Sequence, residues 1–129
     1  MKFGYTTVYV PDVPASLAFF EAAFGLKRRF LAETNDYGVL ETGATALAFA
    51  ARELIKLHSP VDFVYASLSD KPLGIAFTFV TPNVEAAHRH AIATGAIELA
   101  APQIKPCGQT VSHVRCPDGT LVGLCTPIG

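Results

Sequence analysis

The sequence contains one pattern twice. The segments VYVPDVPASLAFFEAAFGLKRRF, residues 8–30, and FTFVTPNVEAAHRHAIATGAIEL, residues 77–99, align almost position for position. Each copy has an apolar alternating stretch, a Pro-containing turn and an amphipathic helix, which Gly25 ends in the first copy and Gly95 in the second. A repeated unit of this kind buries its apolar face against its neighbour, so an active cavity is expected where the two copies meet.

The repeat divides the chain into two modules of one domain. With 129 residues and 50% hydrophobic content, the chain is long enough to bury one core. We expect a single domain, 1–129, with a first module at 1–51, a crossing segment at 52–73 and a second module at 74–129. In the crossing segment the periodicity fades, which predicts a short helix and irregular chain.

Periodicity and turn residues place the elements within each module. In the first module, strands are predicted near 3–10, 27–34, 37–42 and 45–51, with a helix near 14–24. In the second, the prediction is a strand at 74–81, a helix at 83–94, a strand at 96–101 and a hairpin at 109–126.

Charge and composition narrow the classes of partner. The 10 basic and 11 acidic residues give a net charge of −1 without a basic stripe, which argues against nucleic acid. No run of about 18 apolar residues predicts a membrane span, and the amino terminus reads as a strand broken by Pro and not as a signal peptide. A cytoplasmic protein is therefore expected, with three buried free thiols, Cys107, Cys116 and Cys125.

Together, the two β-α-β-β-β modules, the opening YVPDVPASLAFFEAAFGLK and the closing VRCPDGTLVGLC resemble the vicinal-oxygen-chelate superfamily. This superfamily includes glyoxalases, extradiol dioxygenases and bleomycin-resistance proteins. The resemblance covers nearly the whole chain and implies an α+β fold in which two βαβββ modules form a cupped mixed sheet, with helices on its outer face. These motifs are specific for the fold but weak for the activity, because the fold hosts several chemistries.

The resemblance also implies where a metal would lie. Enzymes of the superfamily place one His, Gln or Glu ligand on the first and fourth strand of each module, and these positions correspond here to Tyr5, Ala48, Ala76 and Gly123. Ala and Gly offer no donor, and a phenol with a pKa of about 10 is a poor one. We therefore expect no metal cofactor, although residues elsewhere remain an alternative source of ligands.

Strand alternation assigns the remaining side chains to the two faces of the sheet. The face away from the helices is predicted to carry small residues and tyrosines: Tyr5, Thr7, Tyr9, Ala46, Ala48, Ala50, Gly74, Ala76, Thr78, Leu121, Gly123 and Cys125. Such a face leaves volume for a planar or apolar ligand stacked on tyrosine. Alternatively, the volume admits a neighbouring chain or loop side chains such as Phe63 and Tyr65.

The last hairpin adds two polar candidates. Cys116-Pro117-Asp118-Gly119 fits a type I turn followed by a bulge, a register that sets His113 opposite Gly123 and Arg115 opposite Leu121. His113 is then a candidate ligand contact, general base or metal donor, or a structural histidine. Arg115 favours an anionic or carbonyl-rich ligand, and the alternative is a salt bridge with Glu41 or Glu98.

Other polar residues are interpreted as structural. His88 and His90 lie two apart on a helix, so they point to different sides and are expected on the solvated surface. His58 is expected to be exposed in the crossing segment, and Glu41 to be a strand-edge carboxylate.

Two classes of function remain open. The first is a metal-independent small-molecule binder similar to bleomycin-resistance proteins, with Tyr5, Thr7, Tyr9, Ala48, Ala76, Thr78, His113, Arg115, Gly123 and Cys125 as ligand-binding candidates. The second is an enzyme, either glyoxalase- or dioxygenase-like with an atypical metal site, or a metal-free isomerase or lyase with His113 as the catalytic residue. The resemblance further implies a homodimer whose cavity is shared between chains, so that Tyr5 and His113 meet across the interface.

Overall fold

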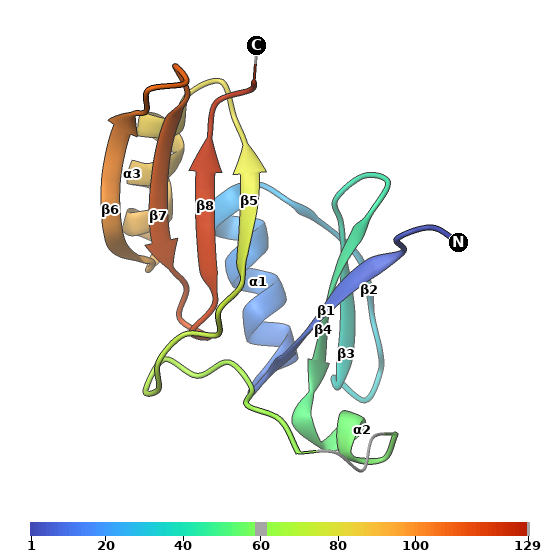
Figure 1. The fold of residues 1–129 in the computed structure, drawn as a ribbon. Helices are drawn as coiled ribbons and strands as arrows, with labels where there is room; N and C mark the ends of the chain where they lie inside the picture. Colours follow the sequence, from blue (N-terminus) through green and yellow to red (C-terminus); the bar gives the residue numbers. More distant parts are fainter. Residues whose placement is uncertain (59–61, 129) are drawn as a thin grey trace.

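The computed structural model describes residues 1–58 and 62–128, and its elements follow the predicted repeat (Figure 1). The first module contains β1 (Tyr5–Val10), α1 (Val13–Phe24), β2 (Lys27–Leu31), β3 (Tyr37–Glu41) and β4 (Ala46–Ala51), and is followed by α2 (Arg52–Lys56). The second contains β5 (Ala76–Val80), α3 (Val84–Thr94), β6 (Ile97–Ile104), β7 (Thr110–Arg115) and β8 (Leu121–Cys125). The α+β class and the βαβββ order of both modules are confirmed.

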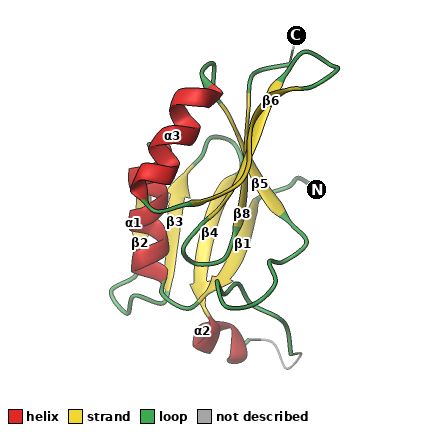
Figure 2. Cartoon of the chain, turned by 90° about the vertical axis from the view of Figure 1, so that its left-hand side faces the viewer, coloured by secondary structure: helices red, strands yellow, loops and turns green. Residues whose placement is uncertain are grey.

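Each module builds its own four-stranded mixed sheet. The strand orders are β1-β4-β3-β2 and β5-β8-β7-β6, with β1 parallel to β4, β5 parallel to β8 and the other pairs antiparallel. In each module the first and last strands are parallel, so the chain between them must cross over the sheet, and the long helix lies in this connection. Both long helices, α1 and α3, lie on the same side of the two sheets (Figure 2).

Matching caps explain where the two long helices begin and end. Asp12 accepts a hydrogen bond from the Ala15 backbone, and Asn83 does the same for Ala86. These N-caps satisfy amide groups that the first helical turn leaves free. Gly25 and Gly95 end the helices with φ of 69° and 128°, a conformation that glycine adopts without steric cost.

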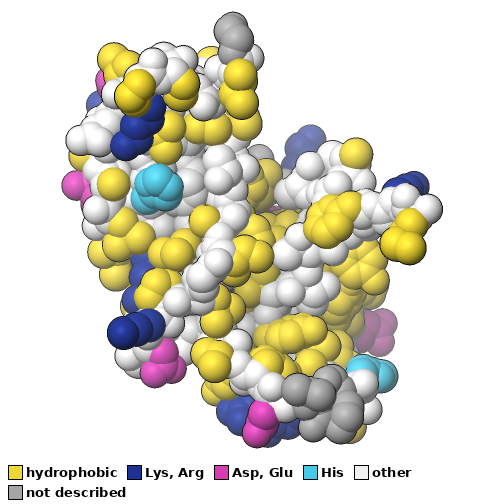
Figure 3. All heavy atoms as spheres, viewed as in Figure 1, with side chains coloured by type: hydrophobic (Ala, Val, Ile, Leu, Met, Phe, Trp, Pro, Cys, Tyr) yellow, Lys and Arg dark blue, Asp and Glu magenta, His cyan; other side chains and the backbone are white. Residues whose placement is uncertain are grey.

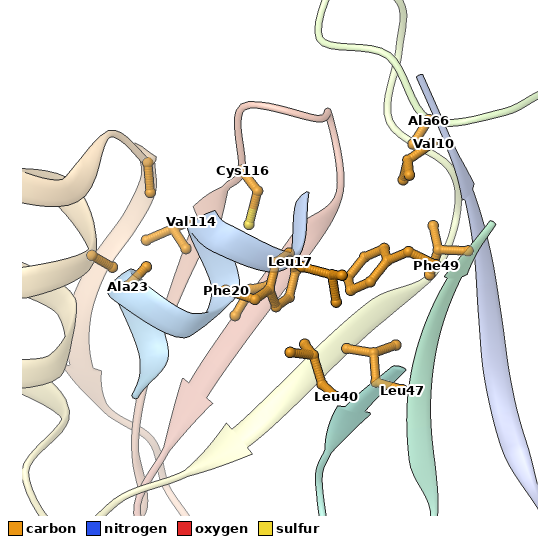
Figure 4. Packing of buried hydrophobic residues seen from close by; sticks show 14 of the residues in the cluster. Val10, Leu17, Phe20, Ala23, Leu40, Leu47, Phe49, Ala66, Val114 and Cys116 are labelled. Carbon is orange, nitrogen blue, oxygen red and sulfur yellow. The ribbon is translucent and has the colours of Figure 1, made fainter. Parts of the chain in front are cut away.

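The two long helices, α1 and α3, form one layer and the sheets form the other (Figure 2). The core lies between these layers and draws on both modules: Leu17 and Phe20 of α1 are fully buried, as are Phe49 and Val114 on the strands. Figure 4 shows the α1 side chains pointing between apolar residues of the two modules. One face of each sheet is covered in this way, and the opposite face stays open.

The two sheets lie side by side without a shared ladder. In the described chain, β1 pairs only with β4 and β5 pairs only with β8. The modules meet instead through α1 and α3, where the His90 ring lies 2.7 Å from the Ala22 carbonyl oxygen, and through Ser16, whose hydroxyl donates to Asp118 at 2.7 Å. A seam therefore runs between the edges of β1 and β5.

The crossing segment is fixed against both modules. The Ala66 amide donates to the Tyr9 carbonyl at 3.2 Å, which holds the segment to β1. At the other end, Arg115 donates to the carbonyls of Ser67 and Asp70. A Cβ atom added to Gly119, whose φ is 92°, would lie 2.5 Å from the Ser67 backbone, so only glycine permits this contact.

Several sequence expectations need correction in detail. The strand predicted at 27–34, β2, ends at Leu31, and β6 continues to Ile104 and not to residue 101. Cys116 is buried as expected and Cys125 is half-buried, but Cys107 is exposed at a turn. Helices of the described residues are all too short or too polar to cross a bilayer.

Candidate functional site

The open face of the first sheet combines small and aromatic side chains. Ala46, Ala48 and Ala50 on β4 are buried, whereas Tyr5 on the neighbouring strand is 60% exposed. The register sets Tyr5 opposite Ala46, and Tyr9 opposite Ala50. Small methyl groups thus lie between larger rings, as alternation predicted, and are almost fully covered.

Aromatic residues outside the predicted set extend this face. Tyr37 lies opposite Ala50 and therefore shares its face, and the Phe30 ring lies 6.4 Å from the Tyr37 ring. Phe63 of the crossing segment packs on Tyr9 with ring centroids 4.6 Å apart. Sequence reasoning treated Phe63 only as a side chain that fills volume, and the alternation of β3 contained the information needed to place Tyr37.

The Tyr37 hydroxyl titrates in an unusual environment. Partial burial raises the pKa of Tyr37 above its ordinary value, and the negative charge of an ionised Tyr5 raises it further. The Tyr37 phenol is therefore neutral at physiological pH and can donate a hydrogen bond.

Two cavities lie along the seam between the modules. One, of about 220 Å³, is lined by Thr6, Thr7, Val8, Tyr9, Phe63, Val64, Leu73, Ile75 and Phe77. The other, of about 300 Å³, is lined by Thr6, Thr42, Thr45, Ala46, Leu47, Ala76, Phe77, Thr78 and Phe79. The cavities share Thr6 and Phe77, so they adjoin, and Figure 3 shows the hollow between the two lobes.

On the second sheet, three predicted residues come together. The register confirms that His113 lies opposite Gly123 and Arg115 opposite Leu121. A Cβ atom placed on Gly123 would be 3.1 Å from the Thr78 hydroxyl oxygen and 3.6 Å from Nε2 of His113. Thr78 and His113 are both exposed, whereas Gly123 between them is buried, so the two polar side chains lie close together at the surface above it.

Arg115 makes contacts that the sequence did not predict. Its guanidinium donates to the Gly119 carbonyl at 3.2 Å and to the Ser67 and Asp70 carbonyls. The alternative of a salt bridge with Glu41 or Glu98 is wrong, because Glu41 pairs with Arg29 at 2.7 Å and Glu98 pairs with His88. The guanidinium instead holds the crossing segment against the last hairpin.

The four positions that correspond to superfamily metal ligands do not fit a metal. Ala48 is a fully buried methyl group, Gly123 has no side chain and Ala76 offers no donor atom. Within residues 1–58 and 62–128, His, Cys, Asp and Glu side chains do not gather in a group of three that could hold a metal ion. The donor set present at these positions is the wrong chemistry for a divalent ion.

His88 is not on the solvated surface, which corrects the sequence interpretation. Its side chain is 5% exposed, and its ring lies 2.9 Å from the Ser112 hydroxyl through Nδ1 and 2.7 Å from Glu98 through Nε2. This Ser-His-Glu arrangement looks like that of a hydrolase, but Ser112 is fully buried and cannot reach a substrate. The three residues form a structural network.

Comparisons with known proteins decide the family. The family model of the Glyoxalase/Bleomycin resistance protein/Dioxygenase superfamily matches residues 2–124. The chain belongs to this superfamily. The two βαβββ modules and the tyrosines on the first sheet are therefore features of one member of the Glyoxalase/Bleomycin resistance protein/Dioxygenase superfamily.

Solved structures of the superfamily share the fold at low identity. A glyoxalase-related enzyme from Fulvimarina pelagi is 19% identical with a TM-score of 0.83, and the match covers 100% of this chain and 93% of that chain. A glyoxalase/bleomycin resistance protein/dioxygenase family enzyme from Burkholderia phytofirmans PsJN is 20% identical with a TM-score of 0.74 and 98% coverage of both chains. A search among curated proteins gave no significant match.

Proposed function

We propose that the protein binds a small planar molecule without a metal and acts by sequestration, like the bleomycin-resistance branch of its superfamily. One observation carries the proposal. Three of the four positions that the resemblance assigns to metal ligands are Ala48, Ala76 and Gly123, and the face that carries Ala48 also carries the rings of Tyr5, Tyr9 and Tyr37. Aromatic rings next to small side chains favour stacking of a flat ligand.

The size and polarity of the seam support a ligand of one or two rings. Small-molecule pockets usually span about 300–1,000 Å³, and the adjoining cavities here are about 220 Å³ and 300 Å³. The Tyr9 and Phe63 rings border the smaller cavity, and Thr78 borders the larger one. A ligand with an apolar ring system and one anionic or carbonyl group matches these walls.

Calorimetric titration with 2-naphthoate, in the presence of EDTA, tests the proposal. We expect binding that EDTA leaves unchanged and that Tyr9→Ala weakens about tenfold, because a lost ring contact is worth roughly 1 kcal/mol or more. Leu57→Ala serves as the control, since Leu57 lies after α2 and is 79% exposed. Binding that disappears with EDTA and returns with added metal would contradict a metal-independent site.

Metal analysis gives a second, independent test. Protein purified without a histidine tag, incubated with nickel, zinc, iron and manganese and then desalted, is expected to retain less than one metal ion per chain. Stoichiometric retention would favour a glyoxalase- or dioxygenase-like enzyme with atypical ligands, and His113 would be the first ligand to replace.

The exposure of His113 favours a second candidate function, metal-free proton transfer in an isomerase or lyase. The imidazole of His113 is exposed and lies near Gly123, which has no side chain, so it can reach a bound substrate. Under this alternative, turnover of a carbonyl substrate is lost in His113→Ala, whereas a binding protein shows no turnover with either form.

We also propose that the working form is a homodimer. Both open faces carry exposed apolar side chains, including Tyr5 at 60%, Phe30 at 50% and Val80 at 63%, and the edges of β1 and β5 are free of strand partners in the described chain. Large exposed apolar areas favour association. Sedimentation that shows a dimer at micromolar concentration supports this proposal, and a stable monomer that still binds 2-naphthoate excludes a shared cavity.

A further inference from the structure

Thr78 and His113 flank a single point on the open face of the second sheet. That point is the position of a Cβ atom on Gly123, 3.1 Å from the Thr78 hydroxyl oxygen and 3.6 Å from Nε2 of His113. Because Gly123 has no side chain, the Thr78 hydroxyl and the His113 ring can lie close to each other above its buried backbone. A group that approaches there lies within reach of a hydroxyl and an imidazole together.

The corresponding position of the first sheet lacks this chemistry. Thr7 lies opposite Ala48, as Thr78 lies opposite Gly123, but Val39 occupies the place that His113 has in the second sheet. The methyl group of Ala48 fills the central space, and an isopropyl group replaces the imidazole. The repeat therefore carries one polar subsite, on the second module only.

The charge near this subsite is positive. Arg115 lies two residues from His113 on the same face of β7, and its guanidinium is bound by backbone carbonyls. The three ion pairs found in the described residues involve Arg28, Arg29 and His88 and leave Arg115 without a carboxylate partner. Carbonyl dipoles hold the guanidinium in place, but its net charge remains and favours an anion nearby.

We infer that Thr78, His113 and Gly123 form a carboxylate subsite, which selects planar aromatic acids over their neutral analogues. Thr78 and His113 hold the carboxylate oxygens, the missing side chain at Gly123 lets these two residues come close together, and Arg115 acts through its charge and not through contact. The inference rests on the proposed binding function and assigns the anionic end of its ligand to one place on the second module.

Paired titrations of 2-naphthoate and 2-naphthamide test the subsite, because these probes share a ring system and differ in charge. We expect the wild-type protein to bind the acid at least tenfold more tightly, since charge-assisted hydrogen bonds are about twice as strong as neutral ones. Thr78→Val and His113→Leu should each remove most of this preference while the affinity for the amide changes less than threefold. Both residues are exposed, so these variants are expected to fold.

The variant Gly123→Ala tests the role of Gly123 in the carboxylate subsite. Its methyl group would occupy the space above residue 123 and shift the Thr78 side chain only slightly, so the preference for the acid is expected to fall while the fold is kept. Matched controls are Thr94→Val on α3 and His58→Leu after α2, each with the same change in chemistry away from the open face.

The outcomes separate the subsite from the proposed function. Tight binding of the acid that all three site variants abolish supports the subsite. Equal binding of acid and amide, or a preference that the three variants leave unchanged, overturns the subsite but leaves the binding function standing. Failure of folded wild-type protein to bind either probe overturns both.

Discussion

The His88 imidazole connects α3 to two strands of the second sheet. Its ring contacts the hydroxyl of Ser112 on β7 and the carboxylate of Glu98 on β6, and its side chain is 5% exposed. Within the described residues, no buried side-chain nitrogen or oxygen lacks a hydrogen-bond partner. Loss of the imidazole would leave the fully buried Ser112 hydroxyl without this partner.

Replacing His88 with Ala is expected to lower the free energy of unfolding by about 2–4 kcal/mol, because an unsatisfied buried hydroxyl and a new cavity both destabilise the fold. Denaturant unfolding measures the change. His58→Ala, at an exposed position, is the control and should stay within about 0.5 kcal/mol. A similarly small effect at His88 would show that the network contributes little.

The position of His88 could have been predicted from helical spacing. Val84, His88 and Ala91 are the buried residues of α3, and they lie at positions i, i+4 and i+7 on one face. The spacing of two residues correctly placed His88 and His90 on different sides of the helix. Their spacing alone does not show which of these sides faces the sheet. The partners Ser112 and Glu98 come from distant strands, and local pattern does not reveal them.

Cys116 supplies a pH-dependent contribution to stability. The pKa of the Cys116 thiol is raised from an ordinary value near 9 to about 12, chiefly by burial; a hydrogen bond with Thr120 opposes this shift, and the charge of Asp118 adds to it. The folded state thus holds a proton that the unfolded state releases above pH 9. The stabilisation is fully present below pH 9 and is lost as the pH rises toward 12.

We expect the free energy of unfolding to fall more steeply between pH 9 and 12 in the wild-type protein than in Cys116→Ala, by up to about 1.4 kcal/mol per pH unit. Chemical denaturation over this pH range provides the measurement, and comparison of the two slopes cancels the titration of the other groups. Parallel slopes would mean that the thiol is accessible and not desolvated.

Among the elements, the crossing segment depends on the last hairpin for its path. Arg115 binds the carbonyls of Ser67 and Asp70, and Gly119 lets the Ser67 backbone approach the turn directly. The turn is itself fixed by the hydrogen bond from the Gly119 amide to the Cys116 carbonyl at 2.8 Å. One hairpin end therefore positions a segment that lies about 50 residues earlier in the sequence.

Arg115→Met is expected to increase hydrogen–deuterium exchange of the amides at residues 67–70 at least tenfold, because it removes the donors that hold this stretch in place. Exchange within β7 and β8 should change little, since their ladder stays intact. Uniformly faster exchange of the second sheet would show that Arg115 stabilises the whole module instead of the crossing segment.

The sequence predicted the last hairpin correctly, but it did not predict the contacts between this hairpin and the crossing segment. The Pro117-Asp118-Gly119 sequence fixes a turn type, and the turn type fixes the register of His113 and Arg115 on their strands. The contacts of Arg115 depend on the path of irregular chain, which has no periodicity to read. The same limit hid the packing of Phe63 on Tyr9, while the ligand-binding roles of the predicted site residues stay predictions.

At the scale of the whole molecule, the two modules are joined by packing of aromatic side chains and not by a continuous sheet. Phe79 of β5 lies 5.1 Å from Phe24 and 6.3 Å from Phe20, both on α1, measured between ring centroids. These contacts join the second sheet to the helix of the first module. The repeat predicted that the modules pack together, and the packing of α1 between them completes the core (Figure 4).

Phe79→Ala is expected to lower the free energy of unfolding by about 3 kcal/mol and to separate the unfolding of the two modules into distinct transitions. Calorimetry, with near-ultraviolet circular dichroism as a second probe, detects such a separation. Val80→Ala is the matched control on the same strand, because Val80 is 63% exposed. A single transition in Phe79→Ala would locate the coupling elsewhere, for example at the bond between Ser16 and Asp118.

The strand order of each sheet has a consequence for synthesis on the ribosome. The first strand of each module pairs with its last, so the β1–β4 ladder forms only after β4 has been made, and the β5–β8 ladder only after β8 has been made. Long-range pairings of this kind close late and slowly. Because the ladders do not cross the seam, the first module can complete its sheet while the second is still being translated, and an unfinished chain already contains a paired β1.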